Sequence, residues 1–246
     1  TLKLMFNNQS VFISGGAQGI GAACSRMFAQ YGAKVLVNYK NSKESAEKLK
    51  NDFPENIEIF HGDMSNSQDI SSAFDAAEKF GGKVSILINN AGIVGRIKFP
   101  NLDKEDFLNT LAINTIGPYL VSKEFASRAG SLPGSIVNIG SMRVFDPTAS
   151  SIDYSASKAA LHNMTLSLAK TLAPKIRVNA VAPGFTKTNM HQGNFERLES
   201  EAKKSLLQRY SSPEDIAESV VFLSSLKAQS ITGQILLVDN GRSLGL

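Results

Sequence analysis

Short apolar segments alternate along the chain with longer amphipathic segments. The apolar segments lie at Ser10–Ser14, Lys34–Asn38, Ile57–His61, Ile86–Asn89, Ser135–Ile139, Arg177–Ala182 and Ile235–Val238. Within them apolar residues do not alternate with polar ones, which is typical of strands buried on both faces, and strands separated by helices form parallel sheets. The pattern predicts an α/β fold, a doubly wound seven-stranded parallel sheet with helices on both faces.

The composition is that of one domain spanning residues 1–246. Hydrophobic residues make up 42% of the chain, charged residues 20%, and no linker-like or repetitive segment interrupts the pattern. No apolar run approaches the length of a membrane span, and Thr1–Ser10 lacks the apolar core of a signal peptide. We therefore expect a soluble, cytoplasmic protein without a membrane partner.

The cysteine and histidine content argues against metal chemistry. Cys24 is the single cysteine and falls in the first predicted helix, so neither a disulfide framework nor a thiolate metal site is expected. We interpret it as a small buried residue. His61, His162 and His191 are scattered without ligand spacing, so no metal site is predicted.

The net charge of +4 and the isoelectric point near 9.1 raise the question of a nucleic-acid partner. The basic residues are mixed with acidic ones, as in the segment Lys43–Lys50, and no aromatic residues interleave with them. This is typical of a solvated helix face, and no nucleic-acid partner is predicted. The positive balance is compatible with a phosphate-bearing cofactor or an acidic carrier.

A glycine-rich turn follows the first predicted strand. Gly15, Gly19 and Gly21 come after a strand and open a helix, an arrangement that lets the backbone approach a pyrophosphate at the positive end of the helix. A merely tight connection is the alternative, but the position after a strand favours a dinucleotide site of the Rossmann type. The residues predicted to line it are Gly15, Gly16, Ala17, Gln18, Gly19, Ile20 and Gly21.

The end of the second predicted strand bears on the choice of cofactor. An NAD site usually has a carboxylate here for the ribose hydroxyls, and this chain has no Asp or Glu before Glu44. Asn38, Lys40 and Ser42 instead offer donors for a 2′-phosphate, with Tyr39 between them. The sequence therefore favours NADP(H) over NAD(H), although a surface position for Lys40 is the alternative.

Tyr154 and Lys158 form the candidate catalytic pair. A predicted helix over Ser155–Lys170 would place them on one face a turn apart, where an ammonium can lower the pKa of a phenol. Alone, the Y-x-x-x-K spacing is common by chance and describes an exposed pair equally well. It gains weight from Ser141, which follows a strand, and from Asn114 within the helical stretch Asp103–Ala129, which we expect to break near Gly117 and Pro118.

These motifs in this order, together with Asn89-Asn90-Ala91-Gly92, resemble the short-chain dehydrogenase/reductase family over essentially the whole chain. The resemblance implies that Ser141 hydrogen-bonds a substrate carbonyl and that Tyr154 donates its proton. It implies that Lys158 lowers the tyrosine pKa and holds the nicotinamide ribose, and that Asn114 keeps a bent helix open around a water leading to Lys158. The cofactor would supply the hydride.

The resemblance also extends the cofactor site. It places Asp63 and Met64 at the adenine, passes backbone of the Asn-Asn-Ala-Gly segment close to the cofactor, and turns the chain around the nicotinamide after the sixth strand. The residues added are Asp63, Met64, Asn90, Ala91, Gly92, Pro183, Gly184 and Thr186, with Tyr154 and Lys158 shared between catalysis and binding. Taken alone, Asp63 would be a candidate N-cap of the following helix, a role for which Ser65–Ser67 compete. The Pro-Gly pair, taken alone, would indicate only a turn.

The segment 187–212 is predicted to be a mobile lid over the substrate. It is polar and amphipathic, with Phe195, Leu198, Leu206 and Leu207 at helical spacing. The C-terminal strand and the tail Asn240–Leu246 look like the association surface of many family members. We expect a homotetramer or a homodimer.

Within the family the chain looks most like the 3-oxoacyl-[acyl-carrier-protein] reductases of fatty acid biosynthesis, which reduce a β-keto thioester to the 3-hydroxy form. An acyl carrier protein is the expected partner on that interpretation, although the basic residues for docking it are reduced to Lys175 and Arg128. A reductase of a small carbonyl substrate such as a sugar, polyol, steroid or pteridine is the alternative. A catalytically silent dinucleotide-binding scaffold is a further one, and the presence of Asn114, Ser141, Tyr154 and Lys158 disfavours it.

Overall fold

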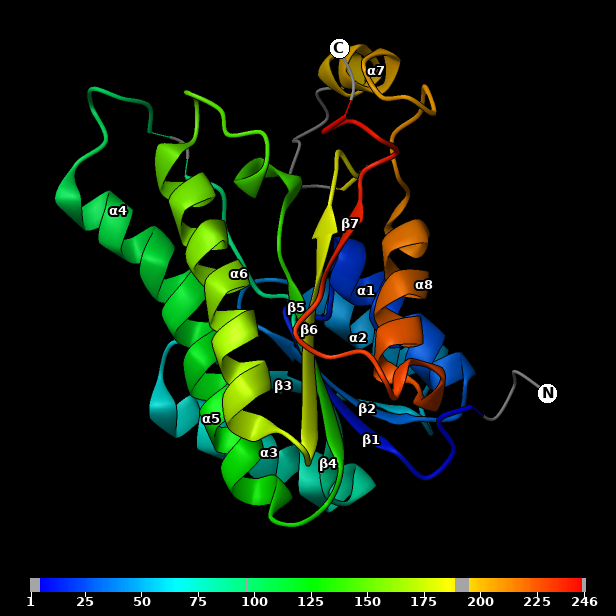
Figure 1. Cartoon of the computed structure of the whole chain (residues 1–246). Coiled ribbons are helices and arrows are strands. Elements are labelled where there is room, and N and C mark those ends of the chain that lie inside the picture. The colour runs from blue at the N-terminus through cyan, green and yellow to red at the C-terminus, as the bar shows by residue number, and fades with distance from the viewer. Residues whose placement is uncertain (1–4, 96, 189–194, 245–246) are drawn as a thin grey trace.

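The computed structural model describes residues 5–95, 97–188 and 195–244. Its seven strands pair in parallel in the order β3-β2-β1-β4-β5-β6-β7, so the predicted seven-stranded parallel sheet is confirmed (Figure 1). Each predicted strand is present, with ends that differ by at most two residues. The strands are β1 Ser10–Ser14, β2 Lys34–Tyr39, β3 Ile57–His61, β4 Val84–Asn89, β5 Gly134–Ile139, β6 Ile176–Pro183 and β7 Ile235–Val238.

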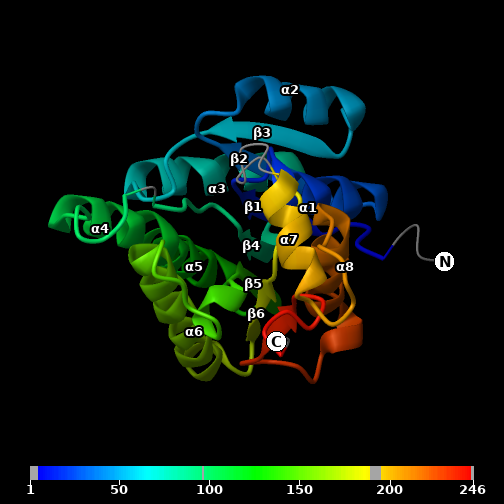
Figure 2. The ribbon, with the colours of Figure 1, turned by 90° about the horizontal axis from the view of Figure 1, so that it is seen from above.

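Helices cover both faces of the sheet (Figures 1 and 2). One face carries α3 Ser67–Gly81, α5 Gly117–Ala129 and α6 Ile152–Leu172; the other carries α1 Gly19–Gln30, α2 Lys43–Asp52 and α8 Pro213–Ser224. The described helices also include α4 Lys104–Leu111 and α7 Phe195–Lys203, and α7 stands beyond the carboxyl ends of the strands. None of the helices in these described ranges is long and apolar enough to cross a membrane.

The two-sided burial explains why the strand segments are apolar throughout. In β1, Val11 and Ile13 belong to the core beneath α1 and α8, whereas Phe12 belongs to the core beneath α3 and α5. Phe12 meets Phe74 of α3 edge to face at 4.9 Å between ring centroids. Full burial of a side chain of this size stabilises a fold by roughly 1.5–3 kcal/mol, so both faces are held by apolar packing.

Cys24 lies in the first of these cores and is fully buried, as predicted. Burial raises the pKa of its thiol to about 12, so the sulfur stays protonated and serves as a small apolar group.

The strand order reverses between β1 and β4, and the segments that follow these two strands therefore meet at the carboxyl edge of the sheet. Open parallel sheets bind ligands at such a switch point. The glycine-rich turn after β1 lies beside the Asn90–Gly92 segment after β4, and α6 brings Tyr154 and Lys158 to the end of the neighbouring β5.

Two predicted elements differ from the structure. The helical stretch before residue 129 forms two α-helices as predicted, and α5 begins at Gly117, but a π-helical turn, Ala112–Ile116, joins α4 to α5 where a break was expected. Pro118 lies in the first turn of α5, where its missing N–H is least costly. The helix α6 is longer than predicted and includes Tyr154.

The lid segment also differs in part. Helix α7 buries Leu198 but ends at Lys203, so Leu206 and Leu207 are exposed outside it and do not continue the predicted helical stripe. Residues 189–194 of the predicted lid, and the side chain of Phe195, lie outside the described part of the structure.

Candidate active site

A group of residues that we call the turn cluster (Ser14, Gly15, Gly21, Asn90 and Ala91) joins the loops after β1 and β4. The Ser14 hydroxyl accepts the backbone N–H groups of Asn90 and Ala91 at 3.1 and 3.2 Å. The Asn90 amide donates to the Gly15 carbonyl at 2.8 Å. The side chains that fix the glycine-rich turn are therefore neutral and short, and their bonds run mainly to backbone.

The glycines of this turn have no room for a side chain. Gly15 has a φ of +61°, and a Cβ there would lie 2.9 Å from the Ala91 Cα. A Cβ at Gly21 would lie 2.3 Å from the Gly15 carbonyl oxygen. Helix α1 follows this turn and begins at Gly19. It has no side-chain cap and no acidic residue in its first turn, so the backbone N–H groups of that turn need another partner. These features fit a pyrophosphate.

Asn38 does not present its amide to a ligand, which corrects one predicted phosphate donor. Its side chain is buried, with Oδ1 accepting from the Gly15 N–H at 3.2 Å and Nδ2 donating to the Gly62 carbonyl at 2.9 Å. The amide therefore braces the glycine-rich turn against the end of β3. Tyr39 is likewise buried, against His61, with ring centroids 5.5 Å apart.

Lys40 remains the basic residue at the end of β2. Its ammonium is 2.5 Å from the Asp63 carboxylate, and this bond holds the Asp63 pKa at about 2. Asp63 does not cap the following helix, because Asn66 accepts the first-turn N–H groups of α3 instead. The predicted adenine residue Met64 is buried beside this pair.

Asn114 is fully buried in the π-helical turn and is tied to the loop after β4. Its Oδ1 accepts from the Ile93 N–H and its Nδ2 donates to the Ile93 carbonyl, both at 2.8 Å, and Nδ2 also donates to the Ser157 hydroxyl at 3.0 Å. A Cβ at Gly92 would lie 3.1 Å from Asn114 Oδ1 and 3.5 Å from Lys158 Nζ. The wider turn therefore brings Asn114, Gly92 and Lys158 together.

Ser141, Tyr154 and Lys158 converge at the carboxyl end of β5. The Lys158 ammonium is buried, donates to the Ile139 carbonyl at 2.8 Å, and lies 5.9 Å from the centroid of the Tyr154 ring. Burial lowers the Lys158 pKa to about 8, so the group is still mostly charged at neutral pH.

The Tyr154 phenol is held in its protonated form. Burial raises its pKa, and this effect outweighs the opposing influence of the Ser141 hydroxyl and the Arg143 charge. The net pKa is therefore raised and is not drawn toward neutral pH as predicted, although the Lys158 ammonium, 5.9 Å from the ring centroid, favours the phenolate through its charge. Tyr154 can therefore donate a proton at neutral pH.

The segment after β6 crosses toward the glycine-rich turn. A Cβ at Gly19 would lie 3.2 Å from the Thr188 methyl group, and one at Gly184 would lie 2.6 Å from the Asp239 Cα. Thr186 is buried and bonds the Gly184 carbonyl, and the buried Pro183 ends β6. The predicted nicotinamide segment therefore runs beside the glycine-rich turn at Thr188 and beside the residue after β7 at Gly184.

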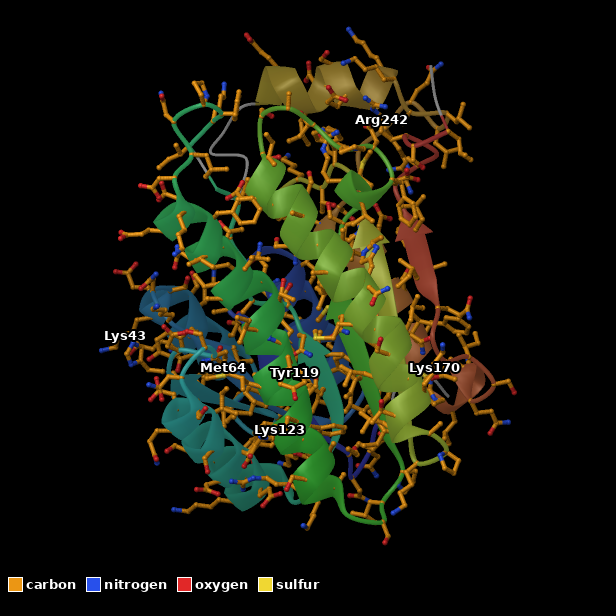
Figure 3. All side chains as sticks on the ribbon, turned by 60° about the vertical axis from the view of Figure 1, so that its left-hand side comes forward. Lys43, Met64, Tyr119, Lys123, Lys170 and Arg242 are labelled. Carbon is orange, nitrogen blue, oxygen red and sulfur yellow. The ribbon has the colours of Figure 1, made fainter. Side chains whose placement is uncertain are left out.

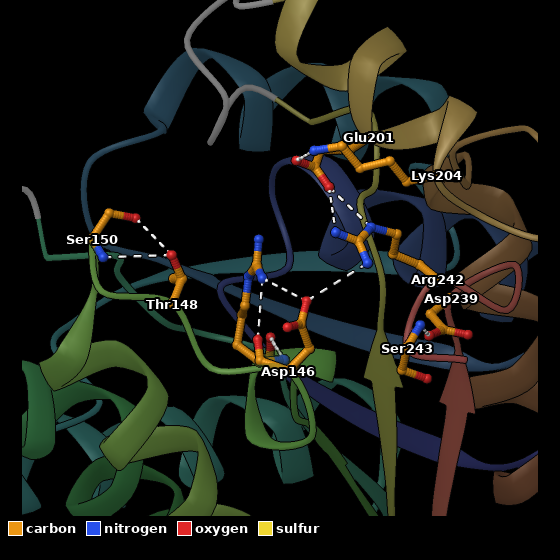
Figure 4. Close-up of polar contacts among 10 residues, drawn as sticks. Asp146, Thr148, Ser150, Glu201, Lys204, Asp239, Arg242 and Ser243 are labelled. Carbon is orange, nitrogen blue, oxygen red and sulfur yellow. Dashed lines mark hydrogen bonds and ion pairs between the residues drawn. The ribbon is translucent and has the colours of Figure 1, made fainter. Parts of the chain in front are cut away.

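A second group, which we call the lid cluster (Asp146, Glu201, Lys204 and Arg242), was not predicted. Arg242 contacts Glu201 through Nε and Nη2, both at 2.9 Å, and Asp146 through Nη1 at 3.8 Å, while Lys204 bonds Glu201 at 2.9 Å (Figure 4). These pairs join the loop after Ser141, helix α7 and the C-terminal tail. Arg143 extends the cluster toward the site: its guanidinium bonds Asp146 at 3.0 Å and lies 5.0 Å from the centroid of the Phe185 ring.

The described residues contain no group of three His, Cys, Asp or Glu side chains arranged to hold a metal ion. The groups of the candidate site described above are glycines, amides and hydroxyls, together with the charged side chains of Lys158, the Lys40–Asp63 pair and the lid cluster.

The chain is similar to known proteins over nearly its whole length. The family model described as enoyl-(acyl carrier protein) reductase matches residues 15–243. Carbonyl reductase family member 4 of Danio rerio is 38% identical over 234 residues, which are 94% of this chain and 97% of that protein. The 3-oxoacyl-[acyl-carrier-protein] reductase of Aquifex aeolicus is 31% identical over 246 residues, 98% of this chain and 99% of the relative. A crystal structure of a short chain dehydrogenase from Burkholderia cenocepacia in complex with NADP matches with a TM-score of 0.90 and 29% identity, covering 97% of this chain and 99% of that chain.

Proposed function

Because this chain belongs to the short-chain dehydrogenase/reductase family, we propose that it is an NADP(H)-dependent reductase that converts a β-keto thioester to the 3-hydroxy thioester. The observation that carries the proposal is the convergence of Ser141, Tyr154 and Lys158 at the end of β5, beside Gly92 and the glycine-rich turn. A carbonyl reductase needs a donor for the developing alkoxide and a cofactor next to it, and this arrangement offers both.

The cofactor supplies a hydride to the carbonyl carbon. Tyr154 donates its phenolic proton to the carbonyl oxygen, which becomes the hydroxyl of the product, and Ser141 hydrogen-bonds the same oxygen. The charged Lys158 stabilises the phenolate left behind. The raised pKa of Tyr154 suits a proton donor, since the phenol is intact at neutral pH before the substrate binds.

The choice of NADP(H) depends on Lys40. The residues at the end of β2 include no carboxylate, and the Lys40 side chain is about half exposed while paired with Asp63. A 2′-phosphate would meet the Lys40 cation there and would compete for it with the Asp63 carboxylate, while the chain itself has no carboxylate between Tyr39 and Glu44. The relative crystallised with NADP is compatible with this proposal.

The carrier remains the less supported part of the proposal. Arg128, one of the two basic residues expected to dock an acidic carrier, is already bonded to Asp75 and Glu124, both at 2.7 Å, and packs over Phe74. Lys175 is exposed and contacts the Gly130 carbonyl at 3.5 Å. The commitment of Arg128 favours, as a second candidate, reduction of a small carbonyl substrate that is not carried on a protein.

The first test is titration of the purified protein with NADPH and NADH, followed by assays with acetoacetyl-CoA and with crotonyl-CoA. We expect tighter binding of NADPH, turnover of acetoacetyl-CoA, and no reduction of the crotonyl double bond. Tyr154→Phe is expected to lower turnover by about 10³-fold without changing the NADPH dissociation constant. Unchanged turnover in this variant, or turnover of crotonyl-CoA alone, would contradict the proposal; cofactor binding without turnover would direct the search to other carbonyls.

We also propose that the protein is a homodimer or homotetramer. Leu108, Ile116 and Tyr119 are about half exposed on the outer side of α4, the π-helical turn and α5, and Tyr119 lies near Lys123 there (Figure 3). An exposed apolar strip of this kind is typical of an association surface. Light scattering after size exclusion should give a mass above the 26.5 kDa of one chain, and Tyr119→Glu should lower it.

A further inference from the structure

One face of α6 carries a polar stripe that faces the end of β5. Along it, Thr165 accepts from the Asn138 amide at 2.9 Å, and Lys158 donates to the Ile139 carbonyl at 2.8 Å. Between these two positions lies His162, one turn beyond Lys158 and with its side chain buried. Thr165 and Lys158 each bond to a residue of β5, and Lys158 also takes part in the proposed reaction. His162 has no role in that reaction.

His162 contacts the catalytic serine through the backbone. Its Nε2 accepts a hydrogen bond from the Ser141 N–H at 3.3 Å. The ring also lies against the preceding residue, because a Cβ at Gly140 would be 2.1 Å from Nε2. Phe145, at the end of the turn that starts at Ser141, packs on the other side with ring centroids 5.8 Å apart. The imidazole therefore lies beneath the turn on which Ser141 is carried.

The turn itself depends on Ser141. The Ser141 hydroxyl accepts from the Arg143 N–H at 3.1 Å at the start of the short helical turn Met142–Val144. Its backbone N–H cannot be satisfied by that turn, and a buried N–H without a partner destabilises the fold. His162 supplies the acceptor.

The imidazole must be neutral to accept this bond, with its proton on Nδ1. Burial and the charge of Lys158 lower the pKa of His162 to about 4, so the acceptor persists at neutral pH. The same environment makes His162 unsuited to exchange protons with a substrate near pH 7.

We propose that His162 is a positioning residue for Ser141: it holds the Ser141 backbone N–H from α6, the helix that carries Tyr154 and Lys158, and so fixes the serine hydroxyl relative to the phenol. The inference rests on the proposed reductase function for its kinetic consequence only. Its structural consequence, protection of the Ser141 amide, is independent of the substrate.

The test compares His162→Leu, which removes the acceptor at similar size, with His162→Gln, whose amide oxygen can replace it. Asn163→Leu, an exposed change at the adjacent position of α6, is the control. Four quantities are measured: amide hydrogen exchange over residues 139–145, kcat and KM for acetoacetyl-CoA with NADPH, and the NADPH dissociation constant. His162→Ala replaces the leucine variant if that protein does not fold.

We expect His162→Leu to speed exchange of the segment and to lower kcat by about tenfold, since a small misplacement of a catalytic group costs at least this much. KM and the NADPH dissociation constant should change by less than about twofold, and His162→Gln should recover most of both losses. Unchanged exchange in His162→Leu, or equal losses in the leucine and glutamine variants, would overturn the proposal. If the wild-type protein does not reduce acetoacetyl-CoA, the β-keto thioester assignment fails and the exchange data still decide the role of His162.

Discussion

The turn cluster and the lid cluster each join segments that lie far apart in the chain, but they do so by different means. In the turn cluster, buried neutral side chains bond to backbone, as when the Asn90 amide donates to the Gly15 carbonyl at 2.8 Å. In the lid cluster, Arg242 lies under α7 and joins segments far apart in the chain through ion pairs (Figure 3). Neutral short bonds tolerate changes of salt and pH, whereas ion pairs respond to both.

The two clusters should also differ in how much one substitution costs. A side chain forced into the close contacts of the turn cluster requires the backbone to move, which costs several kcal/mol in a packed structure. A partly exposed ion pair contributes about 0.2–1 kcal/mol.

Gly21→Ala should nearly abolish cofactor binding. Its Cβ would lie 2.3 Å from the Gly15 carbonyl oxygen and 2.9 Å from the Gly16 Cα, so the turn would have to open. We expect the NADPH dissociation constant to rise by about 100-fold or more, measured by fluorescence titration. Gly82→Ala is the control: no heavy atom lies within 4 Å of its Cβ, but its φ of +77° and ψ of −171° fall in a region that is essentially restricted to glycine, so we expect a loss of stability of about 1–3 kcal/mol with unchanged binding.

Lys40→Ala should weaken NADPH binding by about tenfold, because one charge-assisted contact to the 2′-phosphate is lost. NADH lacks this phosphate, so its binding should not change. Lys43→Ala is the control, because its 3.7 Å pair with Glu47 is exposed on α2. Equal effects on both cofactors would show that Lys40 does not contact the 2′-phosphate.

The pH dependence should separate the buried lysine from the lid cluster. The Lys158 pKa is about 8, so its charge is lost as the pH rises through that value and kcat/KM for reduction should fall there. The same lysine titrates near 10.5 in the unfolded chain, so between about pH 8 and 10.5 the unfolded chain binds more protons than the folded one. The contribution of Lys158 to the free energy of unfolding therefore increases as the pH rises through this range, while activity falls. Burial raises the Glu201 pKa, but the bonds to Lys204 and Arg242 lower it by more, so its net pKa lies below the ordinary value and Glu201 stays a carboxylate over this pH range. A constant kcat/KM from pH 7 to 9.5 would contradict the assignment.

The sheet and the turn cluster were predictable because their signals are local. Each strand is marked by its own apolar run, and Gly15, Gly21 and Asn90 stand next to the strands that place them. The local pattern did not predict the π-helical turn, since the widening around Asn114 depends on its bonds to Ile93, on another segment; only the family resemblance implied a helix held open there. The phosphate role predicted for Asn38 failed for the same reason: its partners Gly15 and Gly62 become neighbours only in the folded sheet.

The lid cluster was beyond prediction because its members lie on three segments. Nothing in the local pattern around Asp146 or Arg242 indicates that they meet, and surface charges of either sign are ordinary. Tyr154 shows the same limit in its energetics. The spacing of Tyr154 to Lys158 was evident from the sequence. The burial that raises the Tyr154 pKa, and the nearby Arg143 charge that opposes this rise, depend on the tertiary structure.

The smallest effect is expected for Arg242→Met. The Arg242 and Glu201 side chains are only 16% and 13% exposed, so their pair is less screened than a surface pair, and its loss leaves Glu201 with Lys204 alone. Because Asp146 loses its link to α7 as well, the lid should be held less firmly over the substrate. We expect KM for acetoacetyl-CoA to rise about threefold, with an unchanged NADPH dissociation constant. Lys204→Met removes the more exposed end of the cluster and should change KM by less than about twofold. Added salt should raise KM in the wild-type protein and have less effect in Arg242→Met, since the screened pair is already gone. If Arg242→Met instead weakened NADPH binding as Gly21→Ala should, the two clusters would act as one unit, and the distinction between a neutral cofactor side and a charged substrate side would be wrong.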